Sequence, residues 1–246
     1  MSCSISHVVV ISIDGLRPDA LQQADTPTLD ALRLQGAYTA QAQAVVPSVT
    51  LINHASMLGG MNPDKHGIYW NNYEPELGNI QGPTLFSAGE EAGLSTALLV
   101  GKDKLQHLVS PDYTGLYHYA GFTDQQVMNV AFDLAETAMP NLLFIHLPNV
   151  DSSGHTLGWM SSGQLLAIEL TDTLIGEFVA HLDRIGLLEE TVLLITSDHG
   201  GSDFGHGSDS PEDTLIPWLA VGPGVLSGLT IEEEVVTYDT AATALS

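Results

Sequence analysis

Aspartate and histidine side chains in several separate segments of the chain are of the types that bind a transition metal ion. The candidates are Asp14, Asp151, His155, Asp198, His199 and His206. Asp151 and His155 flank the residues Ser-Ser-Gly, and we expect a short loop there to turn both groups onto one metal ion. Asp198 and His199 are followed by two glycines, which let the backbone pass close to a cation. Carboxylate and imidazole ligands together favour zinc or manganese over magnesium or calcium.

Each of these residues also has an ordinary structural explanation. An Asp-Gly pair after a strand, such as Asp14-Gly15, is usually a turn. A histidine in a glycine-rich loop, such as His206, is usually a solvated side chain. The functional interpretation therefore depends on all six residues occurring together, at or just beyond the ends of successive strands.

Cysteine usage narrows the kind of metal site. Cys3 is the one cysteine in the sequence, so neither an intrachain disulfide nor a thiolate metal cluster can form. A transition metal must then be held by histidine and carboxylate, which favours a hydrolytic zinc or manganese site over a structural one.

The charge balance of the chain is strongly acidic. Its 246 residues include 6 Lys and Arg against 30 Asp and Glu, a formal net charge of −24. Such a surface repels nucleic-acid backbones and anionic lipid, so we expect neither a nucleic-acid polymer nor a membrane as partner. The simplest explanation is a surface tuned for solubility. An anionic phosphate ester can approach only where bound cations reverse the local potential.

The elements that must position these residues alternate between strands and helices. Apolar, β-branched runs predict strands at 7–13, 39–46, 95–100, 141–147, 191–196 and near 218–221. Helical spacing and cap residues predict helices that begin near 26 and cover 51–58, 84–92, 124–138 and 164–185. This alternation predicts an α/β fold with a doubly wound, mostly parallel sheet flanked by helices, in a single domain 1–246 without a large cap. Asp14, Asp151 and Asp198 each follow a strand, so they meet at the edge where such sheets bind ligands.

The order of these motifs resembles that of a known family. Along the chain run Asp14-Gly-Leu-Arg-Pro-Asp, Thr50-Leu-Ile-Asn53-His54, Lys65-His66-Gly67, Asp151…His155, Ser197-Asp198-His199-Gly200 and His206-Gly207. The series is similar to that of the type I phosphodiesterase/nucleotide pyrophosphatase branch of the alkaline phosphatase superfamily. The match covers essentially the whole chain in the same order.

The resemblance implies an alkaline phosphatase-like core that holds two divalent metal ions, zinc or alternatively manganese. In that case Asp14, Thr50, Asp198 and His199 line one metal site, and Asp151, His155 and His206 hold the other. The resemblance also implies that Thr50 is the nucleophile and forms a phosphothreonine intermediate. Asn53 would match the asparagine that donates a hydrogen bond to a non-bridging phosphoryl oxygen.

The residue type and position of Thr50 agree with that role. A threonine hydroxyl is a weak nucleophile at neutral pH, and coordination to a cation makes its alkoxide accessible. A helix that begins at Thr50 places Asn53 on the same face and directs backbone N–H groups at an anion. A threonine before an apolar run is also a common helix cap, and one residue can serve both purposes.

The same residues predict hydrolysis of phosphodiester or pyrophosphate bonds in a small molecule. A monoesterase must neutralise a dianion, often with an arginine, and no arginine is adjacent to Thr50. Phosphomonoesterase, phosphonate hydrolase and phosphomutase activities are alternatives on the same metal platform, as is a non-catalytic metal-binding protein. A sulfatase is disfavoured because the nucleophile position holds neither Cys nor Ser. Lys102 and Lys104 could meet a substrate anion, although a helix start paired with local acids is the simpler interpretation.

The two ends of the chain bear on its location and completeness. Residues 1–7 lack the basic residues and cleavage site of a signal peptide, and no apolar run reaches the about 18 residues that span a bilayer. We therefore expect a cytoplasmic location by default, or a secreted or periplasmic one if a leader was removed. Residues 235–246 resemble the start of a final helix that stops abruptly, which suggests a trimmed or minimal C-terminus. No pattern in the sequence indicates an oligomeric state.

Overall fold

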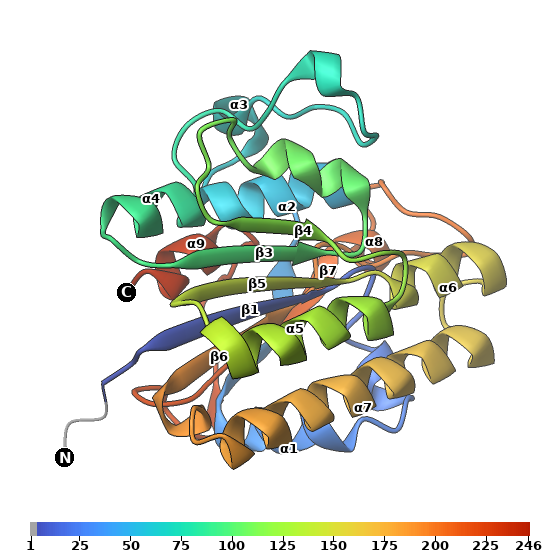
Figure 1. The fold of residues 1–246 in the computed structure, drawn as a ribbon. Coiled ribbons are helices and arrows are strands. Elements are labelled where there is room, and N and C mark those ends of the chain that lie inside the picture. The colour runs from blue at the N-terminus through green and yellow to red at the C-terminus, as the bar shows by residue number, and fades with distance from the viewer. Residues whose placement is uncertain (1–3) are drawn as a thin grey trace.

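One eight-stranded sheet between two layers of helices forms the frame of the computed structural model, which describes residues 4–246 (Figure 1). The strands are β1 (His7–Ile13), β2 (Ala37–Gln43), β3 (Thr96–Val100), β4 (Leu116–Tyr119), β5 (Leu142–Leu147), β6 (Thr191–Thr196), β7 (Leu215–Val221) and β8 (Leu229–Thr230). Their order across the sheet is β4-β3-β5-β1-β6-β7-β2-β8. The first five of these strands pair in parallel, whereas β7 runs antiparallel to both β6 and β2. This confirms the predicted α/β class and the mostly parallel sheet.

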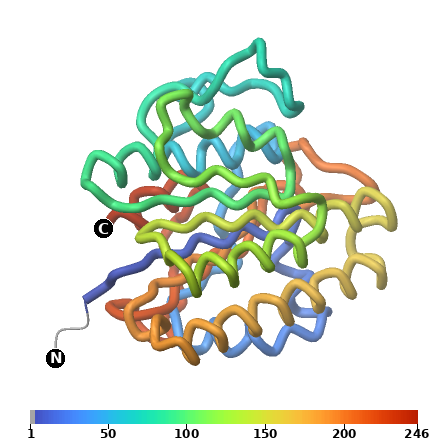
Figure 2. The backbone as a smooth tube through the Cα atoms, viewed as in Figure 1, coloured from blue at the N-terminus to red at the C-terminus, as the bar shows by residue number. Residues whose placement is uncertain are grey.

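Helices cover both faces of the sheet. They are α1 (Pro27–Gln35), α2 (Thr50–Gly59), α3 (Pro63–His66), α4 (Leu85–Glu91), α5 (Asp124–Ala138), α6 (Asn149–Leu157), α7 (Ser162–Arg184), α8 (Pro211–Thr214) and α9 (Asp239–Ala244). Four short 3-10 helices lie at Ala20–Gln22, Pro75–Leu77, Asp103–Leu108 and Leu188–Glu190. Figures 1 and 2 show α1, α5 and α7 on one face of the sheet and α2, α4 and α9 on the other.

The alternation of side chains along each strand divides the core into two layers. In β1, Val9 and Ile11 pack in the layer that contains α1, α5 and α7, whereas Val10 between them packs in the layer with α2, α4 and α9. Strands buried on both faces read as continuous apolar runs, which is why β1 and β6 were recognisable from sequence.

Two elements differ from the sequence-based expectations. The segment from Asp151 to His155 was predicted to be a loop, and this prediction is wrong because it lies inside α6. Its Ser-Ser-Gly composition is typical of a loop, but the Ser152 hydroxyl donates to the Pro148 carbonyl one turn earlier and α6 packs along α7. The edge strand β4 was not predicted, because its four residues alternate between half-buried and exposed and form only a short apolar run.

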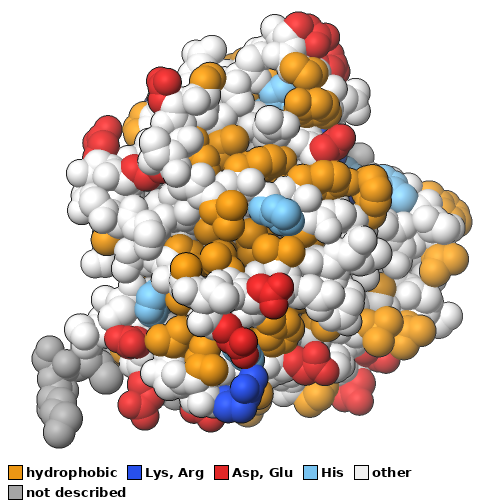
Figure 3. Space-filling view, viewed as in Figure 1, with side chains coloured by type: hydrophobic (Ala, Val, Ile, Leu, Met, Phe, Trp, Pro, Cys, Tyr) orange, Lys and Arg blue, Asp and Glu red, His pale blue; other side chains and the backbone are white. Residues whose placement is uncertain are grey.

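The parallel strands all run in one direction, and their carboxyl ends lie on the side of the sheet where α6 is found (Figure 1). The start of β1 and helix α9 lie at the opposite edge (Figure 2). The short α9 partly fulfils the expectation of a final helix within residues 235–246. Acidic side chains are scattered over the face in Figure 3, whereas Lys and Arg form one small patch on it. No helix among the described residues combines the length and apolar character needed to cross a membrane.

Candidate functional site

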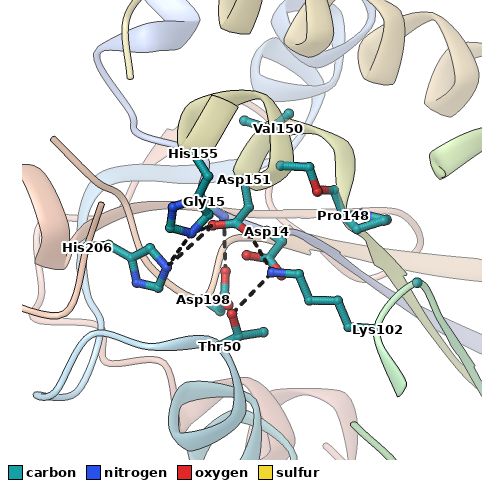
Figure 4. A network of polar contacts seen from close by, with 12 residues as sticks. Asp14, Gly15, Thr50, Lys102, Pro148, Val150, Asp151, His155, Asp198 and His206 are labelled. Atoms are coloured by element: carbon teal, nitrogen blue, oxygen red, sulfur yellow. Dashed lines mark hydrogen bonds and ion pairs between the residues drawn. The ribbon is translucent and has the colours of Figure 1, made fainter. Parts of the chain in front are cut away.

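The residues singled out from sequence converge at the carboxyl edge of the sheet (Figure 4). Asp14 directly follows β1, and Asp198 and His199 follow the neighbouring β6. Asp151 and His155 stand one helical turn apart on α6, and His206 comes from the loop after β6. Two groups of three potential metal ligands result, Asp14-Asp198-His199 and Asp151-His199-His206, each with ligand atoms within 4.8 Å of one another.

We define the buried cluster as Asp14, Thr50, Asp198 and His199, all with 0% exposure. The His199 Nε2 atom lies 3.4 Å from Asp14 Oδ1, 3.3 Å from Asp198 Oδ2 and 3.3 Å from Thr50 Oγ1. The His199 Nδ1–H donates to the Gly200 carbonyl at 2.8 Å, so the Nε2 lone pair faces the centre of the cluster. Two carboxylates and the hydroxyl of Thr50 therefore lie around one imidazole nitrogen.

Hydrogen bonds from residues outside the buried cluster fix the position of its two carboxylates. The Gly101 N–H donates to Nδ1 of the buried His146, so His146 Nε2 carries the proton and donates to Asp14 Oδ2 at 2.7 Å. The Gly15 N–H donates to Asp198 Oδ1 at 3.2 Å. These bonds leave Asp14 Oδ1 and Asp198 Oδ2 buried and without a hydrogen-bond partner among the described residues. Buried carboxylate oxygens of this kind are costly unless a cation meets them.

The open cluster consists of Asp151, His155 and His206. Asp151 Oδ1 lies 3.4 Å from His155 Nε2 and 3.5 Å from His206 Nε2, and it too has no hydrogen-bond partner among the described residues. The Nδ1–H of His155 donates to the Phe204 carbonyl and that of His206 to the Ser48 carbonyl. Both Nε2 atoms are then acceptors, yet they face each other at 3.2 Å. Two facing lone pairs beside a carboxylate are the arrangement that a bound cation satisfies.

The two clusters adjoin through His199 and His206, whose rings stack with centroids 3.7 Å apart. This explains why His199, rather than His155, groups with Asp151 and His206 when ligand atoms are selected by mutual distance alone. The contacts of His155 with both Asp151 and His206 are as short as those between the other members. We therefore keep His155 in the open cluster and regard His199 as the boundary between the two.

Helix α6 and one tryptophan support the open cluster. Asp151 and His155 are four residues apart and so share one face of the helix. Trp159 packs against Gly154 and Gly201, where the first side-chain carbon of any larger residue would lie 2.7 Å and 2.2 Å from the ring. The indole N–H of Trp159 donates to the Gly15 carbonyl at 3.0 Å. Both glycines are therefore required for close packing of α6, the loop after β6 and the turn after β1.

Helix α2 begins at Thr50, as predicted, and Val49 is its N-cap residue. The predicted role of Asn53 does not fit the structure. Its amide NH2 donates to the backbone carbonyls of Val45, Pro47 and Val49, and its Oδ1 accepts the Val45 N–H. Asn53 thus holds the loop before α2, and its fully buried amide is occupied by backbone groups. Position on one helix face with Thr50 was not sufficient, because the side chain bonds to its own preceding loop.

Asn71 is placed better for contact with a substrate. Its Oδ1 accepts the N–H of Leu51, the residue after Thr50, at 2.9 Å, and the Lys104 ammonium at 3.1 Å. No described residue accepts a hydrogen bond from its NH2 group, so this group is available as a donor beside the start of α2. Sequence reasoning missed Asn71 because it lies in an irregular segment after α3, and only the fold brings it to Leu51.

Lys102 stands between the two clusters (Figure 4). Its Nζ lies 2.7 Å from Asp14 Oδ2, 2.6 Å from Asp151 Oδ2 and 3.4 Å from Thr50 Oγ1. Lys102 does begin a 3-10 helix, as predicted, but the prediction that it pairs with local acids is wrong. Its partners are far away in sequence, and the scarcity of lysine in the chain was the signal that pointed to it. His146 was also missed, because it lies within the apolar run of β5.

Burial and charge shift the acidity of the site residues in opposite directions. Burial raises the pKa of Asp198 to about 7, and the neighbouring Asp14 carboxylate adds to this effect. Burial would also raise the pKa of Asp14, but Lys102 and His146 outweigh it and hold that pKa well below its usual range. Burial lowers the pKa of His206 to about 4, so its imidazole is neutral and free to act as a ligand. Several carboxyl groups thus share one lysine in a buried site, which favours additional cations there.

Three further polar residues near the site have partners within the protein. His54 is buried, donates from Nδ1 to the Thr50 carbonyl at 2.8 Å and lies 2.9 Å from the Ser12 hydroxyl. His66 is buried and bonds within its own loop to the Ile68 N–H. The Arg17 guanidinium binds both carboxylate oxygens of Asp19.

Comparisons with known proteins agree with this arrangement. A model of the family described as type I phosphodiesterase/nucleotide pyrophosphatase matches residues 8–216. An uncharacterised pyrophosphatase/phosphodiesterase of Schizosaccharomyces pombe is 27% identical over 216 residues, which cover 79% of this chain and 44% of that protein. Human ectonucleotide pyrophosphatase/phosphodiesterase family member 1 is 25% identical over 213 residues, which cover 78% of this chain and 23% of that protein. The chain thus spans less than half the length of these curated relatives.

Among solved structures, murine ectonucleotide pyrophosphatase/phosphodiesterase 5 has a similar fold. An inactive variant of that protein with one Thr→Ala substitution, in complex with AMP, superimposes with a TM-score of 0.83 at 17% identity. The alignment covers 97% of this chain and 93% of that structure. At this level of identity the likeness concerns the fold.

Proposed function

Because this chain belongs to the type I phosphodiesterase/nucleotide pyrophosphatase family, we propose that it hydrolyses phosphodiester or phosphoanhydride bonds of small molecules. Thr50 is the nucleophile in this proposal. The buried and open clusters each hold one divalent cation, zinc by the choice of ligands and manganese as the alternative.

One observation carries the proposal. The Thr50 hydroxyl lies at the first residue of α2, 3.3 Å from His199 Nε2, in the cluster where two carboxylate oxygens lack a hydrogen-bond partner among the described residues. A nucleophilic hydroxyl, a helix start and a ligand set thus share one point. A hydroxyl that served only the fold would not need to face such a set.

The side chains then have separate tasks. The cations would supply Lewis-acid stabilisation for the oxygens at phosphorus and for the Thr50 alkoxide. Thr50 Oγ1 forms a bond to phosphorus as the bond to the leaving oxygen breaks, and the hydroxyl proton passes to solvent. The NH2 group of Asn71, which the Leu51 N–H holds beside the start of α2, donates to a non-bridging oxygen. Water then cleaves the phosphothreonine and restores the Thr50 hydroxyl.

The comparisons support a small nucleotide-like substrate. The murine structure contains AMP, and its inactivation by a Thr→Ala substitution agrees with a threonine nucleophile. The acidic surface of this chain, with a formal charge of −24, disfavours polymeric nucleic acid.

Phosphomonoesters are the second candidate substrate class. The argument against them was the lack of an arginine near Thr50, but Lys102 Nζ lies 3.4 Å from Thr50 Oγ1 and supplies a cation there. A dianionic phosphoryl group could be neutralised by that ammonium together with the metal ions.

Elemental analysis of the purified protein, paired with hydrolysis assays, tests the proposal. Bis-p-nitrophenyl phosphate and p-nitrophenyl phosphate are assayed before and after chelation. We expect two metal ions per chain, loss of hydrolysis on chelation and recovery when zinc is restored. The ratio of the two rates ranks diesters against monoesters. Absence of bound metal and of metal-restorable hydrolysis would overturn the proposal.

A further inference from the structure

Lysine is rare in this chain, and its distribution is uneven. The sequence has three lysines, Lys65, Lys102 and Lys104, against 30 acidic residues. Lys65 is exposed on the short helix α3, whereas Lys102 and Lys104 are only half-buried and lie beside the nucleophile. A strongly acidic chain that places two of three lysines at one site concentrates positive charge where an anion must approach.

Lys102 and Lys104 approach Thr50 from the same segment by different routes. Lys102 Nζ is 3.4 Å from Thr50 Oγ1 and also bridges Asp14 and Asp151. Lys104 Nζ donates to Asn71 Oδ1, which in turn accepts the N–H of Leu51, the next residue after Thr50. The Lys102 ammonium therefore lies next to the Thr50 hydroxyl. The Lys104 ammonium is linked to the start of α2 through the Asn71 side chain.

The two lysines differ in how their charges are compensated. Lys102 forms ion pairs with two carboxylates, whereas Lys104 forms none with any described residue and has only the neutral Asn71 oxygen. Burial lowers the pKa of Lys104, and the neighbouring Lys102 lowers it further. An ammonium group that is partly desolvated and lacks a carboxylate partner favours an anion from outside the chain.

We propose that Lys104, anchored by Asn71 and backed by Lys102, forms a subsite for a second anionic group of the substrate, a carboxylate or phosphate close to the scissile phosphorus. The proposal rests on the proposed phosphoesterase function and adds a specificity-determining residue to it. The subsite would favour such substrates over esters of equal size whose second substituent is neutral. Lys104 does not reach the reacting hydroxyl itself, so it acts on selection rather than on bond cleavage.

Two matched esters test the subsite with the metal-loaded protein. Ethyl p-nitrophenyl phosphate and carboxymethyl p-nitrophenyl phosphate share a leaving group and nearly the same size, and they differ by one carboxylate. ADP serves as the arm with a phosphate as second anion. For Lys104→Met we expect kcat/KM to fall about 10- to 100-fold for the carboxymethyl ester, for ADP or for both, since hydrogen bonds to charged groups are of that strength. The ethyl ester should change less than about threefold, and Lys104→Arg should restore part of the loss.

Lys65→Met is the matched control, because it removes the same charge from an exposed position outside the site. If Lys104→Met lost kcat/KM equally on all three substrates, Lys104 would only support the fold. If kcat/KM changed on none of them, Lys104 would form no subsite. Either result overturns the proposal. If the unaltered protein hydrolyses none of the substrates, the proposed function fails instead. Binding of the methylphosphonate analogues of the two esters, measured by calorimetry, then tests the subsite by itself. We expect tighter binding of the carboxymethyl analogue, and we expect this preference to disappear in Lys104→Met.

Discussion

The buried and open clusters use the same residue types but differ in their surroundings. Asp14, Asp198 and His199 have side chains with 0% exposure, whereas those of Asp151, His206 and His155 are 4%, 7% and 44% exposed. The carboxylates of the buried cluster are held from behind by His146 and by the Gly15 N–H. In the open cluster, His155 and His206 are each held by one bond to a loop carbonyl.

This difference separates two properties of a metal site. A ligand set that is buried and braced keeps its geometry without the ion, so it binds tightly and exchanges slowly. A ligand set on a helix and a loop depends on the ion to hold its parts together. We therefore expect the cation of the open cluster to leave first when a chelator is added, in a two-phase release.

Replacement of Thr50, the proposed nucleophile, should have the largest effect. Thr50→Ala is expected to reduce kcat by at least about 10³-fold, because the reaction loses its covalent step, while both clusters retain their metal ions. Thr50→Ser, which keeps a hydroxyl, should retain measurable turnover. Steady-state kinetics and metal analysis of the same samples give the answer. Full activity in Thr50→Ala would instead point to direct attack by water.

Loss of one ligand from the open cluster should affect one ion. His155→Ala is expected to weaken metal binding at the open cluster by about 100-fold or more, so dialysis leaves one ion per chain. His118→Ala, which alters an exposed histidine far from the site in sequence, is the control and should keep both ions. Loss of both ions in His155→Ala would show that the clusters are not independent, contrary to the comparison above.

Loss of the support behind Asp14 should weaken the buried cluster. His146→Leu removes the donor to Asp14 Oδ2 and is expected to lower the affinity of that cluster for metal about 10- to 100-fold. His146→Gln supplies an amide donor and should recover part of the affinity. Titration of the metal-free protein with zinc measures both values. Equal affinities in all three proteins would contradict the idea that bracing distinguishes the clusters.

The smallest effect concerns the start of α6. Asp124 and Asn149 exchange backbone-to-side-chain hydrogen bonds, and burial raises the pKa of Asp124 to about 6 despite the bonds from Thr171 and Asn149. A raised folded-state pKa means that the stability contribution is present below the unfolded pKa near 4 and is lost as pH rises through about 6. Asp124→Asn should therefore gain on the order of 2 kcal/mol relative to the unaltered protein between pH 4 and pH 8.

Thermal or urea unfolding at both pH values measures this gain. Asn suits the position, because its oxygen can accept the Asn149 N–H while the Thr171 hydroxyl donates to the Ala167 carbonyl. Asp133→Asn alters an exposed acid on helix α5, the helix that Asp124 begins, and should show no such pH dependence. If Asp124→Asn followed the same pH profile as the unaltered protein, Asp124 would not limit the stability of the α6 start.

Sequence patterns were sufficient for the frame of this site and for the meeting of its candidate ligand residues. The apolar runs before Asp14 and Asp198 correspond to strands buried on both faces, and helix α5 has the predicted bounds. Neighbouring parallel strands then bring their carboxyl ends together, so the convergence of the ligands followed from topology.

Sequence patterns could not predict contacts that depend on packing or that join residues far apart in the sequence. Asn53 was misassigned because its amide satisfies nearby carbonyls instead of facing outward. The partners of Lys102 are 88 and 49 positions away, Asp14 and Asp151, and no local pattern reveals them. The helical state of Asp151 to His155 depends on the packing of Trp159 against Gly154.

Trp159 also gives the protein an optical reporter of its own metal content. Its ring lies edge-on to His155 at 5.1 Å and to His206 at 5.8 Å, so its fluorescence senses whether those imidazoles are bare, protonated or coordinated. Trp70 packs on His107 and Trp218 donates to Thr240, both in other parts of the chain. Replacement of these two by phenylalanine leaves Trp159, next to the open cluster, as the one tryptophan of the chain. The filling and emptying of that cluster can then be followed in real time without any added dye.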